Sequence, residues 1–390
     1  MRILSIETSC DETAISIVEA TGMFPEATYE IVGNALFSQI EIHKEYGGVF
    51  PALAKREHIK TILPMLKEAL TEADLLEENV NTVTAELAEK LHLLLSREEG
   101  LASELISFLE QYQLPEIDLI AVTQGPGLEP ALWVGINFAK ALSAITKVPV
   151  VPVNHMEGHI FASVFDVVED DKLAQISFPA LALLISGGHT ELIAMDSWAK
   201  FEKVGQTKDD AVGEAFDKVA RMMGLPYPGG PEIGTRAKRA RAEKLPPFKE
   251  NLPRPMLHSK DLDFSFSGLK TAVRTAIGEK KLSETEIDAL SRDFEDAVAE
   301  VLLKKTADAL TQYSAQTLIV GGGVSANTYI KDTFTTQLLS SHPDVEVYFP
   351  QPKLSTDNSI MIALAGHARY EEARTAGAIT LIVADGNRSL

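Results

Sequence analysis

Two histidines stand four residues apart in the stretch NHMEGHIFAS, which begins at Asn154. Residues four apart share one face of a helix, so His155 and His159 can both reach a single metal ion. Glu157 lies roughly 200° around the helix from His155, at about 100° per residue, and it therefore points away from that ion. In H-E-x-x-H zinc proteases the glutamate sits beside the bound water. The spacing thus favours metal binding over protease chemistry, with ordinary packed or surface histidines as the alternative.

A third ligand must come from elsewhere in the chain, and Asp357 is the best candidate. It stands in LSTDNSIMIA, after a turn and just before a segment that reads as a buried helix. An aspartate in that place is also a good helix N-cap, which is the alternative interpretation. Two histidines and one carboxylate leave coordination positions open for substrate and water, so the set suits a Lewis acid.

Glycines follow two of the predicted strands. Ser186–Thr190 reads SGGHT and can present backbone N–H groups to a phosphate or a carboxylate. Gly321–Gly323 lies between the strand QTLIV and a helix expected to start near Ser325 or Asn327. That geometry directs N–H groups and the helix dipole at an anion. Each glycine run also occurs in plain hairpins and close packing, and the second lacks the lysine of a Walker loop.

An aspartate and a glycine turn follow the SGGHT segment along the chain. Asp217 is expected on a helix that ends at Gly224, and the rigid turn YPGGP then brings Gly229 and Gly230. These features can grip a ribose and a base, and the alternative is a salt-bridged aspartate followed by a loop. A further anion contact is predicted at the helix start FSFSGLKTAV, through Ser265, Ser267 and Lys270.

Strands and helices must alternate to position these residues, which predicts an α/β architecture. The strands ILSIET and AISIVEA flank the turn SCDET, so the first hairpin carries Asp11 and Glu12 in its loop. The later segment FPALALLISGGHTELIAM repeats this plan of strand, small-residue turn and strand. Apolar residues at three- and four-residue steps in the intervening segments indicate helices. Two such hairpins predict an internal duplication, with one hairpin in each lobe.

The bulk composition sets the class of protein. A chain of 390 residues favours two domains or two lobes of one unit. No apolar run in the sequence approaches the roughly 20 residues of a membrane helix, and the N-terminus reads as a strand rather than a signal peptide. The single cysteine, Cys10, excludes an internal disulfide, so a reducing cytoplasm is expected. The net charge of −20 argues against a general nucleic-acid binder.

Charge is nevertheless uneven along the chain. Between Thr71 and Ile117 there are eleven acidic and two basic residues. The helix-patterned segment at about 75–113 is expected to be a surface helical hairpin, inserted before the strand IDLIAVTQ. The stretch RAKRARAEK, at 236–244, holds five basic residues and one acidic residue. Such a strip can hold a phosphate backbone locally, or it can be a solvated helix face.

The order of the motifs is more informative than any one of them. Along the chain come the hairpin with an acidic turn, the H-x-x-x-H helix, LLISGGHTEL, GEAFDKVARMMGLPYPGGP, DFSFSGLKTAV, IVGGGVSAN and STDN. This series resembles the tRNA N6-adenosine threonylcarbamoyltransferase family in its bacterial form. The resemblance covers nearly the whole chain, except the acidic segment at about 75–113.

The resemblance implies the two-lobed fold of the actin, Hsp70 and sugar-kinase superfamily, with duplicated lobes and a central cleft. The expected N-terminal lobe comprises residues 1–175 and is completed by 358–390, and the C-terminal lobe comprises 176–357. The implied reaction moves the threonylcarbamoyl group of L-threonylcarbamoyl-adenylate to N6 of adenosine 37, in tRNAs that read codons beginning with A, and releases AMP. The alternatives are an ATP-dependent kinase or ATPase of the same superfold and a non-catalytic scaffold subunit.

The family's functional residues correspond to matching positions in this chain. His155, His159 and Asp357 match its metal ligands, which implies one Fe²⁺ per subunit, with Zn²⁺ as the alternative. Asp11 and Glu12 match an acidic pair near the reacting centre, and either could accept the N6 proton. The residues that match substrate contacts are Leu184, Ile185, Ser186, Gly187, Gly188, Asp217, Gly230 and Asn327, and Gly234 stands at a further contact position.

Gly234 departs from the family pattern, because many relatives carry there a polar residue, often aspartate, that touches the nucleotide. One ribose contact is therefore in question. The resemblance further implies two protein partners, a shorter paralogous subunit and a P-loop ATPase subunit, and no membrane partner. The basic strip becomes the candidate contact for tRNA phosphates, through Arg236, Lys238, Arg239 and Arg241.

Overall fold

The computed structural model describes residues 1–79, 82–166, 171–248, 251–376 and 382–390. This part of the chain forms two compact units, each of which is described by itself. The sequence predicted divisions after residues 175 and 357. The first unit comprises Met1–His43, Val49–Ala174 and Asp357–Ser389, and the second comprises Lys44–Gly48, Gln175–Thr356 and Leu390.

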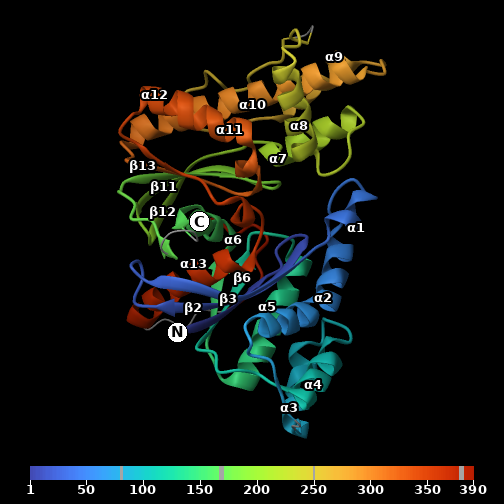
Figure 1. Cartoon of the computed structure of the whole chain (residues 1–390), viewed down its shortest axis with the longest axis vertical. Helices are drawn as coiled ribbons and strands as arrows, with labels where there is room; N and C mark the ends of the chain where they lie inside the picture. Colours follow the sequence, from blue (N-terminus) through green and yellow to red (C-terminus); the bar gives the residue numbers. More distant parts are fainter. Residues whose placement is uncertain (80–81, 167–170, 249–250, 377–381) are drawn as a thin grey trace. The chain divides into compact units, whose positions relative to one another are not determined.

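A mixed sheet forms the centre of the first unit (Figure 1). The second strand in the chain pairs antiparallel with the first and the third, and the last two long strands run parallel to the first. In spatial order the strands are β7 (Val150–Asn154), β6 (Leu119–Gly125), β1 (Arg2–Glu7), β2 (Glu12–Thr21), β3 (Thr28–Ser38), β9 (Lys172–Leu173) and β8 (Phe165–Asp166).

The second unit repeats this arrangement in a sheet of five strands. Two antiparallel pairings are again followed by two parallel ones. In spatial order the strands are β14 (Glu346–Tyr348), β13 (Thr317–Gly321), β10 (Ala180–Ile185), β11 (Thr190–Ser197) and β12 (Lys200–Gln206). The order matches β7-β6-β1-β2-β3 strand for strand. The predicted α/β fold with an internal duplication, one hairpin to each unit, is therefore confirmed.

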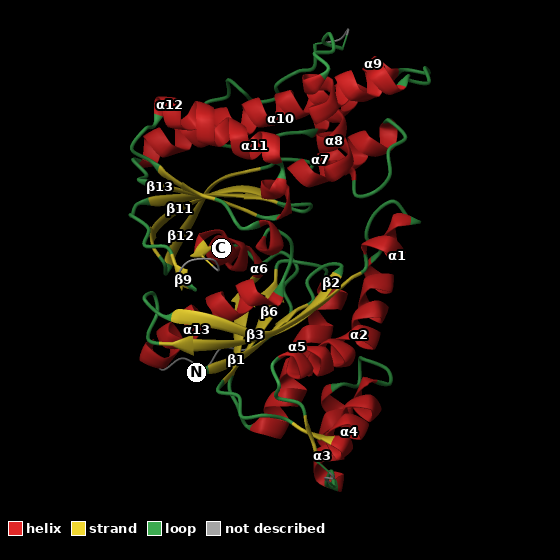
Figure 2. Ribbon diagram, viewed as in Figure 1, coloured by secondary structure: helices red, strands yellow, loops and turns green. Residues whose placement is uncertain are grey.

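β1 occupies the middle of its sheet, and its side chains alternate between the two faces. Leu4 and Ile6 join the hydrophobic core that β1 forms with α2 (Pro51–Glu72) and α5 (Glu129–Thr146). The alternate positions, Ile3, Ser5 and Glu7, point to the opposite face. There β1 contacts α13 (Ser359–Ala376), which packs against α6 (His155–Val164). Helices therefore cover both faces of the first sheet, as Figure 2 shows. The short helix α1 (Ile40–Lys44) follows β3.

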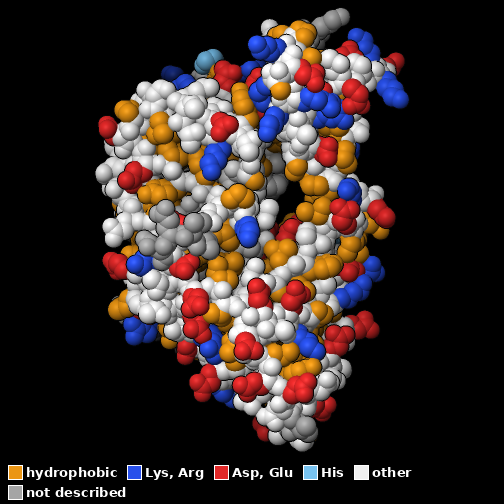
Figure 3. All heavy atoms as spheres, in the orientation of Figure 1, with side chains coloured by type: hydrophobic (Ala, Val, Ile, Leu, Met, Phe, Trp, Pro, Cys, Tyr) orange, Lys and Arg blue, Asp and Glu red, His pale blue; other side chains and the backbone are white. Residues whose placement is uncertain are grey.

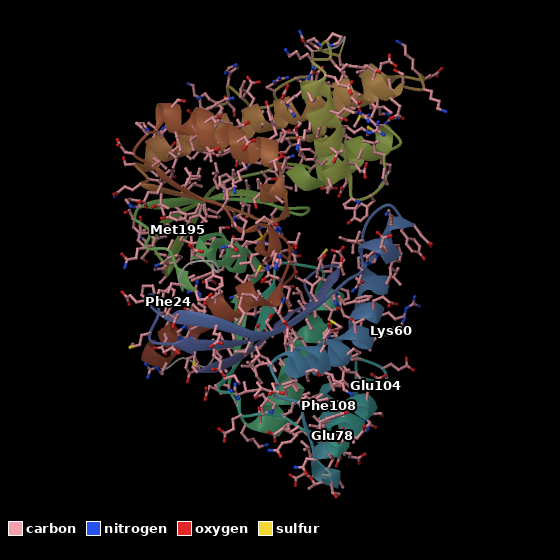
Figure 4. The ribbon with its side chains drawn as sticks, in the orientation of Figure 1. Phe24, Lys60, Glu78, Glu104, Phe108 and Met195 are labelled. Carbon is pink, nitrogen blue, oxygen red and sulfur yellow. The ribbon has the colours of Figure 1, made fainter. Side chains whose placement is uncertain are left out.

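The acidic segment is helical, as predicted, and it belongs to the first unit. It contains α3 (Ala85–Leu94) and α4 (Leu101–Gln111), closed by an antiparallel pair of short strands, β4 (Glu77–Glu78) and β5 (Tyr112–Gln113). Acidic side chains gather on the face around these helices (Figure 3). On α4, Glu104 is exposed while Phe108 is buried (Figure 4). Most of the segment is exposed, as predicted for a surface hairpin, while Leu91, Leu105 and Phe108 on its inner face join the core with α2 and α5.

Four helices pack together on the sheet of the second unit, and the residues they bury form its hydrophobic core. They are α7 (Val212–Met222), α8 (Gly229–Ala242), α9 (Ser267–Ile277) and α10 (Glu284–Tyr313). α10 begins with a capping box, in which the Ser283 and Glu286 side chains bond each other's backbone N–H groups. The remaining elements are η1 (Gly323–Ala326), α11 (Thr328–Thr333), η2 (Phe334–Leu338), α12 (Leu339–Ser341) and η3 (Pro352–Leu354).

Within the described ranges, the helices are all too short or too polar to cross a membrane.

Candidate metal centre and substrate-binding surface

α6 brings the two histidines of the H-x-x-x-H stretch onto one face. The Asn154 side chain caps the helix by accepting the Met156 N–H at 2.9 Å, so the helix begins at His155. Asp357 approaches from the segment that precedes α13. Its Oδ1 lies 3.3 Å from Nε2 of His155 and 3.2 Å from Nε2 of His159. The ligand atoms of the three residues all lie within 4.8 Å of one another, and both histidines are buried.

The donor set fits a metal ion. Both ring nitrogens of His159 are buried and make no hydrogen bond within the part of the chain that the structure describes. Buried polar atoms of this kind normally have a partner, and a cation between the two Nε2 atoms and Asp357 Oδ1 would provide one. Two imidazoles and one carboxylate are the facial set of non-haem Fe²⁺ sites, and they also suit Zn²⁺. The structure thus brings together all three predicted ligands.

The charges around the site favour a cation. Burial alone lowers the pKa of His155, but the carboxylates of Asp357 and Glu7 outweigh burial and raise that pKa well above its usual value. Burial likewise pushes the pKa of Asp357 upward, and the two imidazoles reverse this and hold it below its usual range. A positive charge is therefore stabilised at this position, whether a proton or a metal ion carries it.

Glu157 does not take the role of the catalytic glutamate of zinc proteases, because it forms an ion pair with Arg369. Its carboxylate is buried and lies 2.8 Å from the Arg369 guanidinium of α13. Burial raises the pKa of Glu157 to about 7, and Arg369 acts in the opposite direction. Because Asp357 directly precedes α13, this ion pair ties the helix that carries both histidines to the element that carries the third ligand.

The acidic turn of the first hairpin lies within electrostatic reach of these ligands. Asp11 and Glu12 are only 8% and 9% exposed. Burial raises the pKa of both carboxyl groups, and the negative charge of Asp357 raises them further. The two groups also interact with each other, so they titrate as a pair. Such a pair holds a proton to higher pH than a free carboxyl group does, which suits proton exchange with a substrate.

Sequence reasoning missed the residue that supports this turn, His58 of α2. Its Nε2 lies 3.0 Å from the Cys10 carbonyl oxygen, and its Nδ1 lies 2.8 Å from Thr13 Oγ1. Nε2–H therefore donates to the carbonyl, and Nδ1 accepts from the threonine. Burial lowers the pKa of His58 to about 4, so the ring is neutral near pH 7. No local signal marks it, because α2 and the turn are far apart in the chain.

In the second unit, the two glycine runs meet at one edge of the sheet. β10 and β13 are parallel neighbours with Leu184 opposite Gly321, so the turn after Ile185 and the Gly321–Gly323 run lie side by side. The Ser186 hydroxyl accepts the N–H groups of Gly188 and His189, at 3.3 and 3.1 Å. A Cβ atom added at Gly187, Gly188, Gly230 or Gly323 would meet nothing within 4 Å.

The remaining predicted substrate contacts lie on helices that follow these glycines. Asp217 of α7 accepts the Gly229 N–H at 2.7 Å, which fixes the start of α8 beside Gly230. Asn327 caps α11 by accepting the Ile330 N–H at 3.0 Å, and its Nδ2 donates to Glu295 at 2.7 Å. A Cβ at Gly234 would lie 3.8 Å from that same Nδ2. The structure thus groups Gly234 with Asn327, and Asp217 with Gly230.

The basic strip on α8 is largely occupied within the protein. Arg236 and Arg239 pair with Asp288 of α10, and Arg241 pairs with Glu295 and Asp296 of the same helix. Figure 3 shows basic and acidic side chains mixed in this region. Lys238 is exposed. These pairs give the three arginines a structural role, so the predicted tRNA contact stays a prediction that depends most on Lys238.

The anion contact predicted at the start of α9 is filled by a side chain of the protein. Asp209 accepts the backbone N–H groups of Phe266 and Ser267, at 2.8 and 3.1 Å. The Ser265 and Ser267 hydroxyls also donate to its carboxylate. Lys270 pairs with Asp210 at 2.7 Å. These polar residues therefore join the segment before α7 to α9, and the predicted anion contact stays a prediction whose donors already bond to aspartates of the chain.

Comparison with known proteins places this chain among close relatives. A family model described as tRNA N6-adenosine threonylcarbamoyltransferase matches residues 30–85 and 99–364. Proteins of that name include one from Nitrosomonas europaea, 39% identical over 95% of this chain and 94% of its own length. A second, from Staphylococcus aureus strain Mu3, is 39% identical over 96% of this chain and 93% of its own length. A third, from Chromobacterium violaceum, is 38% identical over 98% of this chain and 96% of its own length.

Between residues 30 and 364, the family match is interrupted only at 86–98, a stretch that holds most of α3. The inserted part is therefore shorter than the predicted 75–113, and α4 belongs to the matched region. This agrees with the packing of α4 into the core of the first unit.

Proposed function

The chain belongs to the tRNA N6-adenosine threonylcarbamoyltransferase family, and from that premise we propose how its residues perform the transfer. It is a transferase that modifies tRNA. The finer reaction we propose moves the threonylcarbamoyl group of L-threonylcarbamoyl-adenylate to N6 of adenosine 37, in tRNAs that read codons beginning with A. The observation that supports it best is the convergence of two imidazoles and a carboxylate, one imidazole of which has no hydrogen bond within the described residues.

His155, His159 and Asp357 are the residues that would hold one Fe²⁺, with Zn²⁺ as the alternative occupant. When bound, such an ion supplies Lewis-acid polarisation of the carbamoyl carbonyl and orients the threonyl-carbamoyl group. Both histidines are buried, and the Glu157–Arg369 pair links the helix that carries them to α13. The Asp357 side chain is 21% exposed and marks the open side of the site.

The acid pair takes up the proton of the reaction. The N6 amine of adenosine is a weak nucleophile, because its lone pair is delocalised into the ring. As N6 bonds to the carbamoyl carbon, the bond from that carbon to the phosphate oxygen breaks, and the N6 proton passes to Asp11 or Glu12. Their raised pKa values make either a stronger base than a free carboxylate.

The glycine edge of the second unit holds the leaving group. AMP departs with new negative charge on its phosphate oxygen, and preorganised donors stabilise such charge. Gly187 is exposed at this turn, and its N–H and the Ser186 hydroxyl are the donors that we propose for that phosphate. Asp217, Gly230, Gly234 and Asn327 would then surround the ribose and the base.

A transfer assay tests the proposal. Purified protein is mixed with threonylcarbamoyl-adenylate and unmodified tRNA, with and without the two proposed partners, the shorter paralogous subunit and the P-loop ATPase. Mass spectrometry of the nucleosides measures threonylcarbamoyl-adenosine. The variants Asp11→Asn and Glu12→Gln are compared, and loss of the proton acceptor should slow transfer by about 100-fold or more.

The outcomes separate the candidate functions. Product that depends on this chain supports the transferase, and equal rates for wild type and both acid variants contradict the role of the acid pair. Phosphate transfer from ATP to a small molecule would instead favour a kinase. Absence of product with matched partners would favour a scaffold subunit. Cell fractionation checks the proposed cytoplasmic location.

A further inference from the structure

Glu7 occupies a place that neither the transfer chemistry nor the metal ligands account for. We infer that its carboxylate is a positioning group, which fixes His155 with the ring proton on Nδ1 and so turns the Nε2 lone pair toward the metal. The inference rests on the metal site proposed above. The two histidines differ on this side of the ring. Nδ1 of His155 faces the Glu7 carboxylate, whereas Nδ1 of His159 makes no hydrogen bond to a described residue.

The strand pattern places Glu7 where it can do this. Glu7 ends β1 on the same face as Ile3 and Ser5, which is the face that contacts α13. Its side chain is completely buried. A buried carboxylate is costly unless its oxygens accept hydrogen bonds. Glu7 therefore needs donors from other elements, and the structure supplies three of them.

All of these donors come from different segments of the first unit. Oε1 accepts the backbone N–H of Ser9 in the acidic turn. Oε2 accepts the Thr123 hydroxyl of β6 at 2.6 Å and lies 3.0 Å from Nδ1 of His155. The Ser9 hydroxyl is a second neighbour of that Nδ1, at 3.2 Å. An ionised carboxylate only accepts, so the His155 nitrogen that faces it must carry the hydrogen.

The tautomer decides what the other side of the ring can do. With the proton on Nδ1, the neutral imidazole has its lone pair on Nε2, and Nε2 faces Asp357 Oδ1 at 3.3 Å. Metal-bound histidines commonly donate their second N–H to a carboxylate, which orients the ring and increases its basicity. The Glu7–His155–Asp357 line has this arrangement. Glu7 itself points at the far side of the ring and is not one of the converging ligands.

His159 provides the contrast within the same helix. Its Nδ1 is buried and makes no hydrogen bond to any described residue. Its ring meets that of His155 edge to face, with the centroids 4.8 Å apart. Both rings face Asp357 through Nε2, but among the described residues only His155 has a carboxylate on its Nδ1 side. Removing the Glu7 charge should loosen one ligand and leave the other as it is.

The test compares Glu7→Gln with wild type and with Glu19→Gln. Glutamine keeps the shape but replaces one acceptor by an NH₂ donor, which faces the existing donors. Glu19 lies on the other strand of the same hairpin, pairs with Arg2 and is partly exposed, so it controls for the chemistry of the substitution. Affinity for Co²⁺ alone is measured by competition with a chelator. Two-bond ¹H–¹⁵N NMR of the imidazoles, recorded on protein loaded with diamagnetic Zn²⁺, reports which nitrogen of His155 carries the proton.

We expect Glu7→Gln to weaken Co²⁺ binding about 10- to 100-fold and Glu19→Gln to bind like wild type, measured at a temperature where thermal unfolding curves show all three proteins folded. The spectrum of the Zn²⁺-bound wild type should show the His155 proton on Nδ1 and none on Nε2. Unchanged Co²⁺ affinity in Glu7→Gln, or a proton on Nε2 in the metal-bound wild type, overturns the inference. The variant His159→Ala distinguishes a failure of the Glu7 inference from a failure of the proposed metal site. If that variant binds Co²⁺ like wild type, the site itself is wrong and both proposals fall.

Discussion

The turn between β1 and β2 and the turn between β10 and β11 occupy the same position in two sheets of the same strand order. The first turn carries Asp11 and Glu12, which are nearly buried and lie within electrostatic reach of Asp357, a proposed metal ligand. The second carries Gly187 and Gly188, beside which there is open space. One duplicated hairpin therefore presents carboxyl side chains, and the other presents bare backbone.

This difference between the two turns separates the parts of the fold that support the proposed site from the parts that we propose contact the substrate. The central strands of both sheets are apolar and buried, and they serve as interchangeable supports. The turns differ because their neighbours differ. In the first unit, α2 supplies His58 to hold the turn and α6 supplies the two histidines of the proposed metal site. In the second, α7 begins so close to the turn that only glycine fits at position 213. The function of each turn is set by the helices packed against it.

The largest effect should come from removing a metal ligand in the first unit. His159→Ala leaves two of three ligands, so we expect metal content to fall from near one ion per chain to near zero. Loss of a Lewis acid removes several kcal/mol of transition-state stabilisation, which corresponds to about 10³-fold or more in transfer rate. Elemental analysis and the transfer assay measure both. The control is His92→Ala, an exposed histidine on α3, which should keep metal and activity. Full transfer without metal would contradict the proposed chemistry.

The next effect concerns the free energy of unfolding. The buried His58 supports the first turn through its bonds to the Cys10 carbonyl and Thr13. The pKa of His58 is about 4 in the folded protein and about 6.5 in the unfolded chain, so the unfolded chain binds the proton more readily. The stabilisation is complete above pH 6.5 and is lost as the pH falls toward 4. The full difference corresponds to about 3 kcal/mol.

Denaturant unfolding at several pH values measures this loss. His58→Gln cannot titrate, so its free energy of unfolding should fall less steeply between pH 6.5 and 4 than that of wild type. His43 and His367 also have pKa values lowered by burial and contribute in the same direction, so the comparison between the two proteins isolates His58. Parallel curves for wild type and variant would show that His58 is not the group responsible.

The sequence predicted those features that short segments carry by themselves. The two hairpins and the paired histidines depend on spacing within one element, and Asp357 stood out by its place before a helix. Glu7, His58 and Arg369 escaped prediction because their roles arise only when distant elements pack. Glu7 meets a histidine 148 positions away. The arginines of α8 read as a free basic strip for the same reason, since their acidic partners lie about 50 positions later on α10.

The smallest of the three effects tests the second turn alone, with a matched pair of glycine substitutions. At Gly187 a Cβ meets nothing within 4 Å, so Gly187→Ala should fold normally while its methyl group obstructs the approach of a phosphate to the backbone. Loss of one charge-assisted hydrogen bond weakens AMP binding by about tenfold or more, because it removes about 1.5 kcal/mol or more. At Gly213 a Cβ lies 2.7 Å from the Ser186 carbonyl oxygen, so Gly213→Ala should lower the unfolding temperature instead. Calorimetry measures both quantities, and metal content should stay at the wild-type level in each variant. If Gly187→Ala binds AMP as tightly as wild type, the phosphate does not lie at this turn, and the division of work between the two hairpins is wrong.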